Sequence, residues 1–86
     1  MRYFVYLLSS SNNKKIITYV GYTNNIIKRL ELHNKGKGAK FTRGRKWKLI
    51  YSEEFKTKKE AISREYYIKK NRKFRNFIKK KYLNEK

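Results

Sequence analysis

Residues 3–8 read YFVYLL and residues 16–22 read IITYVGY, and these two runs decide the fold. Each run is apolar, aromatic and β-branched, which favours an extended strand. The residues from Ser9 to Asn13 between them are turn formers, and they predict a loop directly after the first strand. The two runs therefore predict an antiparallel hairpin, which the insertion-like stretch from Ser9 to Lys15 lengthens.

A short amphipathic helix is predicted after the hairpin. Either Thr23 or Asn24 precedes it as N-cap, and Gly36 supplies a C-terminal stop. Between these limits apolar positions recur at helical spacing, namely Ile26, Ile27, Leu30 and His33. From Lys35 to Trp47 the chain is basic and punctuated by glycine, which predicts an exposed loop.

The rest of the chain predicts one strand and two helices. Apolar residues over 48–55 indicate the strand, Thr57 and Glu60 match a capping box, and Asn71 indicates a break before a last helix over 72–81. The expected apolar positions of the two helices are Ala61, Ile62, Glu65 and Ile68, then Phe74, Phe77, Ile78 and Tyr82. Because no βαβ alternation is present, residues 1–86 predict a single α+β domain with a three-stranded antiparallel sheet flanked by helices.

The charge balance indicates the partner. The chain has 25 Lys and Arg against six acids, all of them Glu, and a formal net charge of +19. Such a charge attracts polyanions, and its spread along the whole chain favours nucleic acid over a membrane surface. The apolar run from Phe4 to Leu8 is too short for a signal peptide or a membrane span, so we expect a cytoplasmic protein with no membrane partner.

Carboxylates that could hold a metal ion are few. Five of the glutamates have ordinary explanations, on a strand, in a cap, on a polar helix face or near the terminus; they are Glu31, Glu53, Glu54, Glu60 and Glu85. Glu65 differs, because it lies on or beside an apolar helix face, where an unpaired carboxylate is costly. From patterning alone, a salt bridge with a basic neighbour explains Glu65 better than a metal does.

Several motifs occur in the order of a nuclease signature. They are Val5-Tyr6-Leu7, Tyr19-Val20-Gly21, Thr23-Asn24 leading to Arg29 and His33, the stretch 35–42, and the stretch 60–65 followed by Ile68-Lys69-Lys70. Over nearly its whole length the sequence resembles the GIY-YIG nucleases, above all their small stand-alone bacterial members. Related domains occur in excision-repair and homing nucleases, which points to DNA repair. One departure is that the first motif lacks its glycine.

The resemblance implies a metal-dependent endonuclease that hydrolyses phosphodiester bonds in nucleic acid, with DNA favoured over RNA. By this resemblance Tyr6 is the general base, Tyr19 is its partner and His33 assists. Arg29 then stabilises the scissile phosphate, and Glu65 is the sole protein ligand of Mg²⁺ or Mn²⁺. One carboxylate is enough in principle, because Mg²⁺ keeps several waters and binds substrate phosphate oxygens. Tyrosine has a pKa of about 10, so a base at neutral pH needs cationic neighbours, such as Arg29 and nearby lysines, or a metal-bound water to lower it.

Substrate binding is expected from the basic loop. Its cations, Lys35, Lys37, Lys40, Arg43 and Arg45, suit a phosphate backbone, with Phe41 or Trp47 available for base stacking. These features predict weak sequence preference and a steep dependence on salt. The alternative is a non-catalytic, basic nucleic-acid-binding module on the same fold, motivated by the charge and the altered first motif. The natural substrate, the choice of metal, the oligomeric state and any protein partner stay open.

Overall fold

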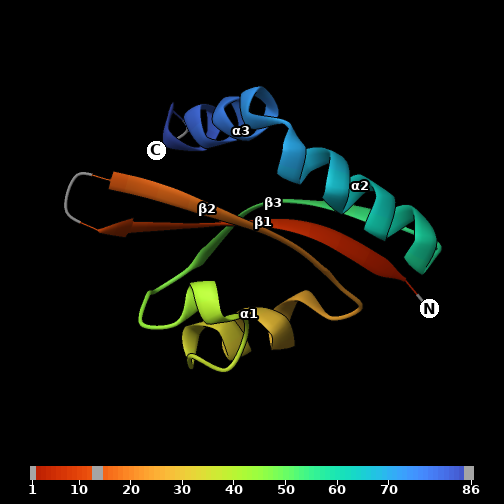
Figure 1. The fold of residues 1–86 in the computed structure, drawn as a ribbon, viewed down its shortest axis with the longest axis horizontal. Helices are drawn as coiled ribbons and strands as arrows, with labels where there is room; N and C mark the ends of the chain where they lie inside the picture. The colour runs from red at the N-terminus through yellow and green to blue at the C-terminus, as the bar shows by residue number, and fades with distance from the viewer. Residues whose placement is uncertain (1, 13–14, 85–86) are drawn as a thin grey trace.

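A three-stranded antiparallel sheet with the order β2-β1-β3 organises the structure, a computed structural model that describes residues 2–12 and 15–84. Helix α1 covers one face of the sheet, and α2 and α3 cover the other (Figure 1). The predicted α+β fold is confirmed. In chain order the elements are β1 (Tyr3–Asn12), β2 (Lys15–Thr23), α1 (Ile26–Asn34), the 3-10 helix η1 (Lys40–Thr42), β3 (Lys48–Phe55), α2 (Lys58–Lys70) and α3 (Arg72–Asn84).

The hairpin is longer and tighter than the sequence predicted. The prediction of a loop from Ser9 onward is wrong, because β1 continues to Asn12, which pairs with Lys15 of β2. Turn preference is a weak local bias, and here the β-branched residues that open β2 supply a pairing partner that outweighs it. The insertion thus lengthens the hairpin as expected, while Asn13 and Lys14 at the expected tip lie outside the described residues.

Helix α1 begins one or two residues later than predicted and ends just before the predicted glycine. Its N-cap is Asn25 rather than Thr23 or Asn24, because the Asn25 Oδ1 accepts a hydrogen bond from the Lys28 N–H at 3.1 Å. Thr23 instead accepts from the Asn25 N–H at 3.1 Å, which turns the chain into the helix. Gly36 ends the helix as predicted, with φ at 76°, a left-handed conformation that glycine adopts without a steric penalty.

Helices α2 and α3 begin where the sequence placed them. The Glu60 N–H donates to the Thr57 Oγ1 at 3.2 Å at the start of α2, and the Phe74 N–H donates to the Asn71 Oδ1 at 3.0 Å at the start of α3. Asn71 therefore both ends one helix and caps the next. No helix within the described residues is long and apolar enough to cross a membrane.

Alternation along β1 creates two apolar cores, one on each face of the sheet. The core beneath α2 and α3 consists of Val5, Leu7, Val20, Ala61, Ile68 and Ile78. The core beneath α1 contains Tyr6, Leu8 and Trp47. Two residues expected on buried helix faces, Ile62 and Phe77, are exposed, because a domain this small covers only a narrow stripe of each helix. The Tyr6 side chain is thereby directed to the α1 side.

Candidate active site

The Tyr6 phenol lies over the edge strand β2 at a position without a side chain. Tyr6 pairs with Gly21 across the ladder, so both residues face the same side of the sheet. A Cβ added to Gly21 would lie 2.3 Å from the Tyr6 Oη and 2.5 Å from its Cζ. Tyr19 lies two residues earlier on the same face, with its ring centroid 6.5 Å from that of Tyr6. The glycine of the second motif therefore makes room for the phenol of the first.

His33 approaches these two tyrosines from α1 and is fully buried. Its Nε2 lies 2.9 Å from the Tyr6 Oη, and its ring centroid lies 5.1 Å from that of Tyr19. The following loop passes closely, because a Cβ on Gly38 would lie 2.2 Å from the His33 Nδ1. The structure thus brings together Tyr6, Tyr19 and His33, which the sequence placed on three different elements.

The hydrogen-bond partners of His33 determine its tautomer. The Thr42 hydroxyl donates its single proton to the Ala39 carbonyl at 2.8 Å, so its oxygen accepts from the His33 Nδ1 at 2.9 Å. With the proton on Nδ1, a neutral imidazole offers a lone pair on Nε2. The Tyr6 hydroxyl therefore donates to His33, and the bonds from Tyr6 through His33 and Thr42 to Ala39 all point the same way.

Thr42 is a residue of this site that sequence reasoning missed. It is fully buried, and its carbonyl accepts from the Trp47 Nε1 at 2.9 Å. The neighbouring Asn34 side chain binds the Trp47 backbone at both N–H and carbonyl. No periodicity or charge marks a threonine in a basic loop; its only signal was membership of the motif 35–42. The basic loop is consequently tied to α1 at both ends and contains η1, rather than being loose.

Burial dominates the electrostatics of the two central groups. It raises the pKa of the Tyr6 phenol above 10.0; the Arg29 side chain lowers it, while the charges of Tyr19 and Glu65 raise it. The expectation that cations lower this pKa overall is therefore wrong, because removal from water outweighs Arg29. Burial, and then the charge of Arg29, hold the pKa of His33 below 6.5. Both side chains are uncharged at neutral pH.

Glu65 lies on α2, which packs against β1 and β2 on the sheet face opposite α1 (Figure 1). Its charge acts on the Tyr6 phenol, and its side chain is only 18% exposed. The ion pair it makes, with the Lys69 Nζ, is 4.0 Å long, beyond hydrogen-bonding distance. Within residues 2–12 and 15–84, no three His, Cys, Asp or Glu side chains cluster as a metal cage. The donor set fits a hard ion held mostly by water and substrate oxygens.

The other predicted binding residues lie on the surface beside this centre. Lys35, Lys37, Lys40 and Arg43 are exposed, and Arg45 is half-buried. Trp47 is 3% exposed and unavailable for stacking, whereas Phe41 is 56% exposed. The Phe41 ring stacks on Tyr19 with centroids 6.1 Å apart and planes at 20°. Val5, which precedes Tyr6 in the first motif, is buried in the core on the opposite face from Tyr6.

Comparisons with known proteins show which family this chain belongs to. Residues 2–82 match the model of the GIY-YIG catalytic domain. A UPF0213 protein of Clostridium perfringens is 53% identical over 68 residues, which is 78% of this chain and 70% of that protein. A UPF0213 protein of Bacillus licheniformis is 54% identical over 69 residues, covering 79% and 68% of the two chains. The solution structure of a UPF0213 protein from Bacillus halodurans aligns with a TM-score of 0.53 and 35% identity over 91% of this chain and 82% of that chain. On these grounds the chain belongs to the GIY-YIG family, a family of nucleases.

Proposed function

We propose that the chain is a divalent-metal-dependent endonuclease that hydrolyses phosphodiester bonds in nucleic acid, DNA rather than RNA, with Tyr6 as general base. The observation that supports this most is the directed hydrogen bond from the Tyr6 Oη to the His33 Nε2, at 2.9 Å. A phenol that donates to an imidazole keeps its own lone pairs free to accept a proton from water. With the proposal go a cytoplasmic location and a role in DNA repair, which rest on the sequence and on the family resemblance.

The raised pKa of Tyr6 is compatible with a base when the proton moves through it. As water attacks phosphorus, one water proton passes to the Tyr6 Oη while the phenol proton passes to the His33 Nε2. The bond from phosphorus to the leaving oxygen breaks, and that oxygen takes a proton from solvent. No free phenolate forms, so the burial that raises the pKa of Tyr6 is no obstacle. Thr42 holds His33 in the accepting tautomer before the transfer and continues to accept from Nδ1 once His33 is protonated.

Arg29 and Glu65 are the residues that would offset the negative charge of the substrate, Arg29 directly and Glu65 through a metal ion. Arg29 acts on both Tyr6 and His33, and its guanidinium is suited to a phosphate by its forked donors. A phosphate bound there also offsets the cationic field that opposes protonation of His33. Glu65 is the protein group that would hold Mg²⁺ or Mn²⁺, an ion that supplies charge neutralisation at the scissile phosphate when bound.

Substrate contacts beyond the scissile phosphate come from the basic loop. Lys35, Lys37, Lys40, Arg43 and Arg45 bind the backbone in this proposal, and no acid stands in the sequence between Glu31 and Glu53 to oppose them. Phe41, stacked on Tyr19 with its ring largely exposed, offers a base-stacking surface beside the phenols.

The test is metal-dependent cleavage by purified protein. Plasmid, single-stranded and branched DNA, and RNA, are incubated with Mg²⁺, Mn²⁺ or EDTA. We expect DNA products with either metal and none with EDTA, and we expect Glu65→Gln to abolish cleavage while DNA binding persists. Glu31→Gln, which removes the same charge from an exposed position of α1, is the matched control and should cleave normally. If the wild-type protein binds DNA but yields no metal-dependent product, the nuclease proposal is refuted and the non-catalytic binding module takes its place.

A further inference from the structure

The junction of α2 and α3 forms an open groove away from the Tyr6 centre. Its walls include Tyr66, Tyr67, Lys70, Asn71, Arg72 and Lys73, and we call it the α2–α3 groove. Three of these residues are cationic, and none of the residues that line the groove is acidic. Two neighbouring aromatic side chains, Tyr66 and Tyr67, are 62% and 49% exposed here, and adjoining exposed aromatic surface of this kind marks interaction sites.

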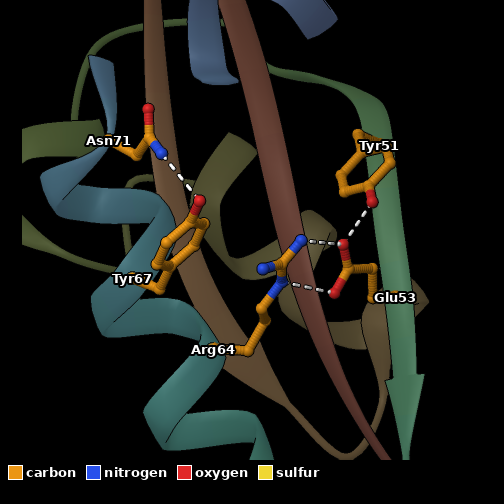
Figure 2. Close-up of polar contacts among 5 residues, drawn as sticks. All are labelled: Tyr51, Glu53, Arg64, Tyr67 and Asn71. Carbon is orange, nitrogen blue, oxygen red and sulfur yellow. Dashed lines mark hydrogen bonds and ion pairs between the residues drawn. The ribbon is translucent and has the colours of Figure 1, made fainter. Parts of the chain in front are cut away.

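One of the two rings is fixed in position by its neighbours. The Arg64 guanidinium carbon lies 4.8 Å from the centre of the Tyr67 ring, and the Asn71 Nδ2 donates to the Tyr67 hydroxyl at 2.9 Å. Arg64 is itself held by β3, because its Nε and Nη2 donate to the two Glu53 carboxylate oxygens at 2.8 and 3.0 Å (Figure 2). Tyr51 also donates to this carboxylate. The Tyr67 ring is thus oriented before any ligand binds, which lowers the entropy cost of binding.

The second ring is the more accessible one. Tyr66 is 62% exposed, and the Lys70 Nζ lies 5.4 Å from its centre. A ring that carries a cation over one face can offer its other face to a base, while the cation supplies a counter-charge for the neighbouring phosphate.

We propose that the α2–α3 groove binds single-stranded nucleic acid, with a base stacked on Tyr66 and phosphates on Lys70, Arg72 and Lys73. The stacking surface favours unpaired bases, since the bases of a duplex are already stacked on one another. An acidic peptide would match the cations but would leave both tyrosine rings unused. The proposed groove does not depend on nuclease activity.

The position of the groove relates it to the proposed chemistry. Tyr66 follows Glu65 directly in α2, and successive helical residues project about 100° apart around the axis. A strand seated in the groove therefore runs along the outer side of the helix that carries the proposed metal ligand. Substrates with a single-stranded arm would then make contacts on both sides of α2.

Binding is measured with the whole protein in EDTA, where a metal-dependent nuclease is inactive. The probes are an oligonucleotide of about 12 nucleotides carrying 2-aminopurine, whose fluorescence falls on stacking, and a duplex of the same sequence. We expect Tyr66→Ala to weaken single-strand binding about tenfold, the lower range for loss of one stacked base, and to reduce the quenching. Duplex affinity should change less than about twofold, and Tyr66→Phe should bind as wild type does.

Two matched controls separate a site from general attraction. Phe77→Ala removes an equally exposed aromatic ring from outside the groove, and Lys58→Ala is paired with Lys70→Ala as a charge control at the other end of α2. Phe77→Ala should bind single strands better than Tyr66→Ala does, and Lys58→Ala better than Lys70→Ala does. Three results would overturn the proposal: Tyr66→Ala binding like wild type, equal losses for groove and control variants, or displacement of the oligonucleotide by a poly-glutamate peptide at equal charge concentration.

Discussion

Replacing Gly21 with alanine perturbs the Tyr6 phenol with a single methyl group. The added Cβ would lie 2.3 Å from the Tyr6 Oη, 2.5 Å from Cζ and 3.1 Å from Cε1, so the ring must move. Tyr6 is buried and its hydroxyl is hydrogen-bonded to His33, so a shift of the ring disrupts both its packing and that hydrogen bond. Overpacking of a core costs about 1–3 kcal/mol and a lost buried hydrogen bond about 1 kcal/mol. We therefore expect Gly21→Ala to lower the free energy of unfolding by about 2–4 kcal/mol.

Urea unfolding followed by the fluorescence of Trp47, the single tryptophan and a buried one, measures this loss. Gly44→Ala is the control, because Gly44 has no atom within 4 Å of an added Cβ. Its cost comes from its φ of 75° alone, and should be about 1–2 kcal/mol. The reasoning is refuted if Gly21→Ala is no less stable than Gly44→Ala and the His33 ring resonances do not shift in NMR spectra.

Three further perturbations test the surroundings of the site. Thr42→Val leaves the His33 Nδ1 without its acceptor, so urea unfolding should show a loss of about 1–3 kcal/mol; an unchanged midpoint would count against the hydrogen bond between His33 and Thr42. Because the pKa of folded His33 lies below its unfolded value of 6.5, the unfolded state takes up a proton first, and stability should fall as pH drops from 6.5 toward the folded pKa. This slope should be missing in His33→Gln, and a wild-type midpoint that stays constant between pH 7 and pH 5.5 would contradict it. Arg64→Gln removes two hydrogen bonds from the largely buried Glu53 carboxylate and should cost about 1–3 kcal/mol in the same assay, whereas Lys58→Gln should cost under about 0.5 kcal/mol.

The element order was readable from sequence because each boundary has a local chemical cause. Thr57 and Asn71 accept hydrogen bonds from the N–H groups that begin α2 and α3, and Gly36 adopts the left-handed conformation that ends α1. Where a boundary is set by contacts between distant residues, the prediction from sequence was wrong. Ser9 to Asn12 prefer turns in isolation, yet pairing with β2 keeps them extended.

The sequence predicted which residues form the candidate site but not which of them contact one another. Motif order pointed to Tyr6, Tyr19 and His33, which the fold places within hydrogen-bonding and ring-contact distance. Thr42 and Gly38 gave no separate signal, because their importance comes from the approach of a loop to a histidine nine and five residues away. The net rise in the pKa of Tyr6 was equally hidden, since it depends on the depth at which the phenol is buried.

Proton transfer through the Tyr6 phenol is the central claim, and single-turnover cleavage measures it most directly. Wild type and Tyr6→Phe are compared with Mg²⁺ and protein in excess over DNA, after Trp47 fluorescence and DNA affinity show both to be folded and bound. A general base contributes about 10²–10⁴ in rate, so the cleavage rate of Tyr6→Phe should fall by at least about a hundredfold. A Tyr6→Phe protein that cleaves within about threefold of wild type would contradict the account, since the missing oxygen would then have carried no proton.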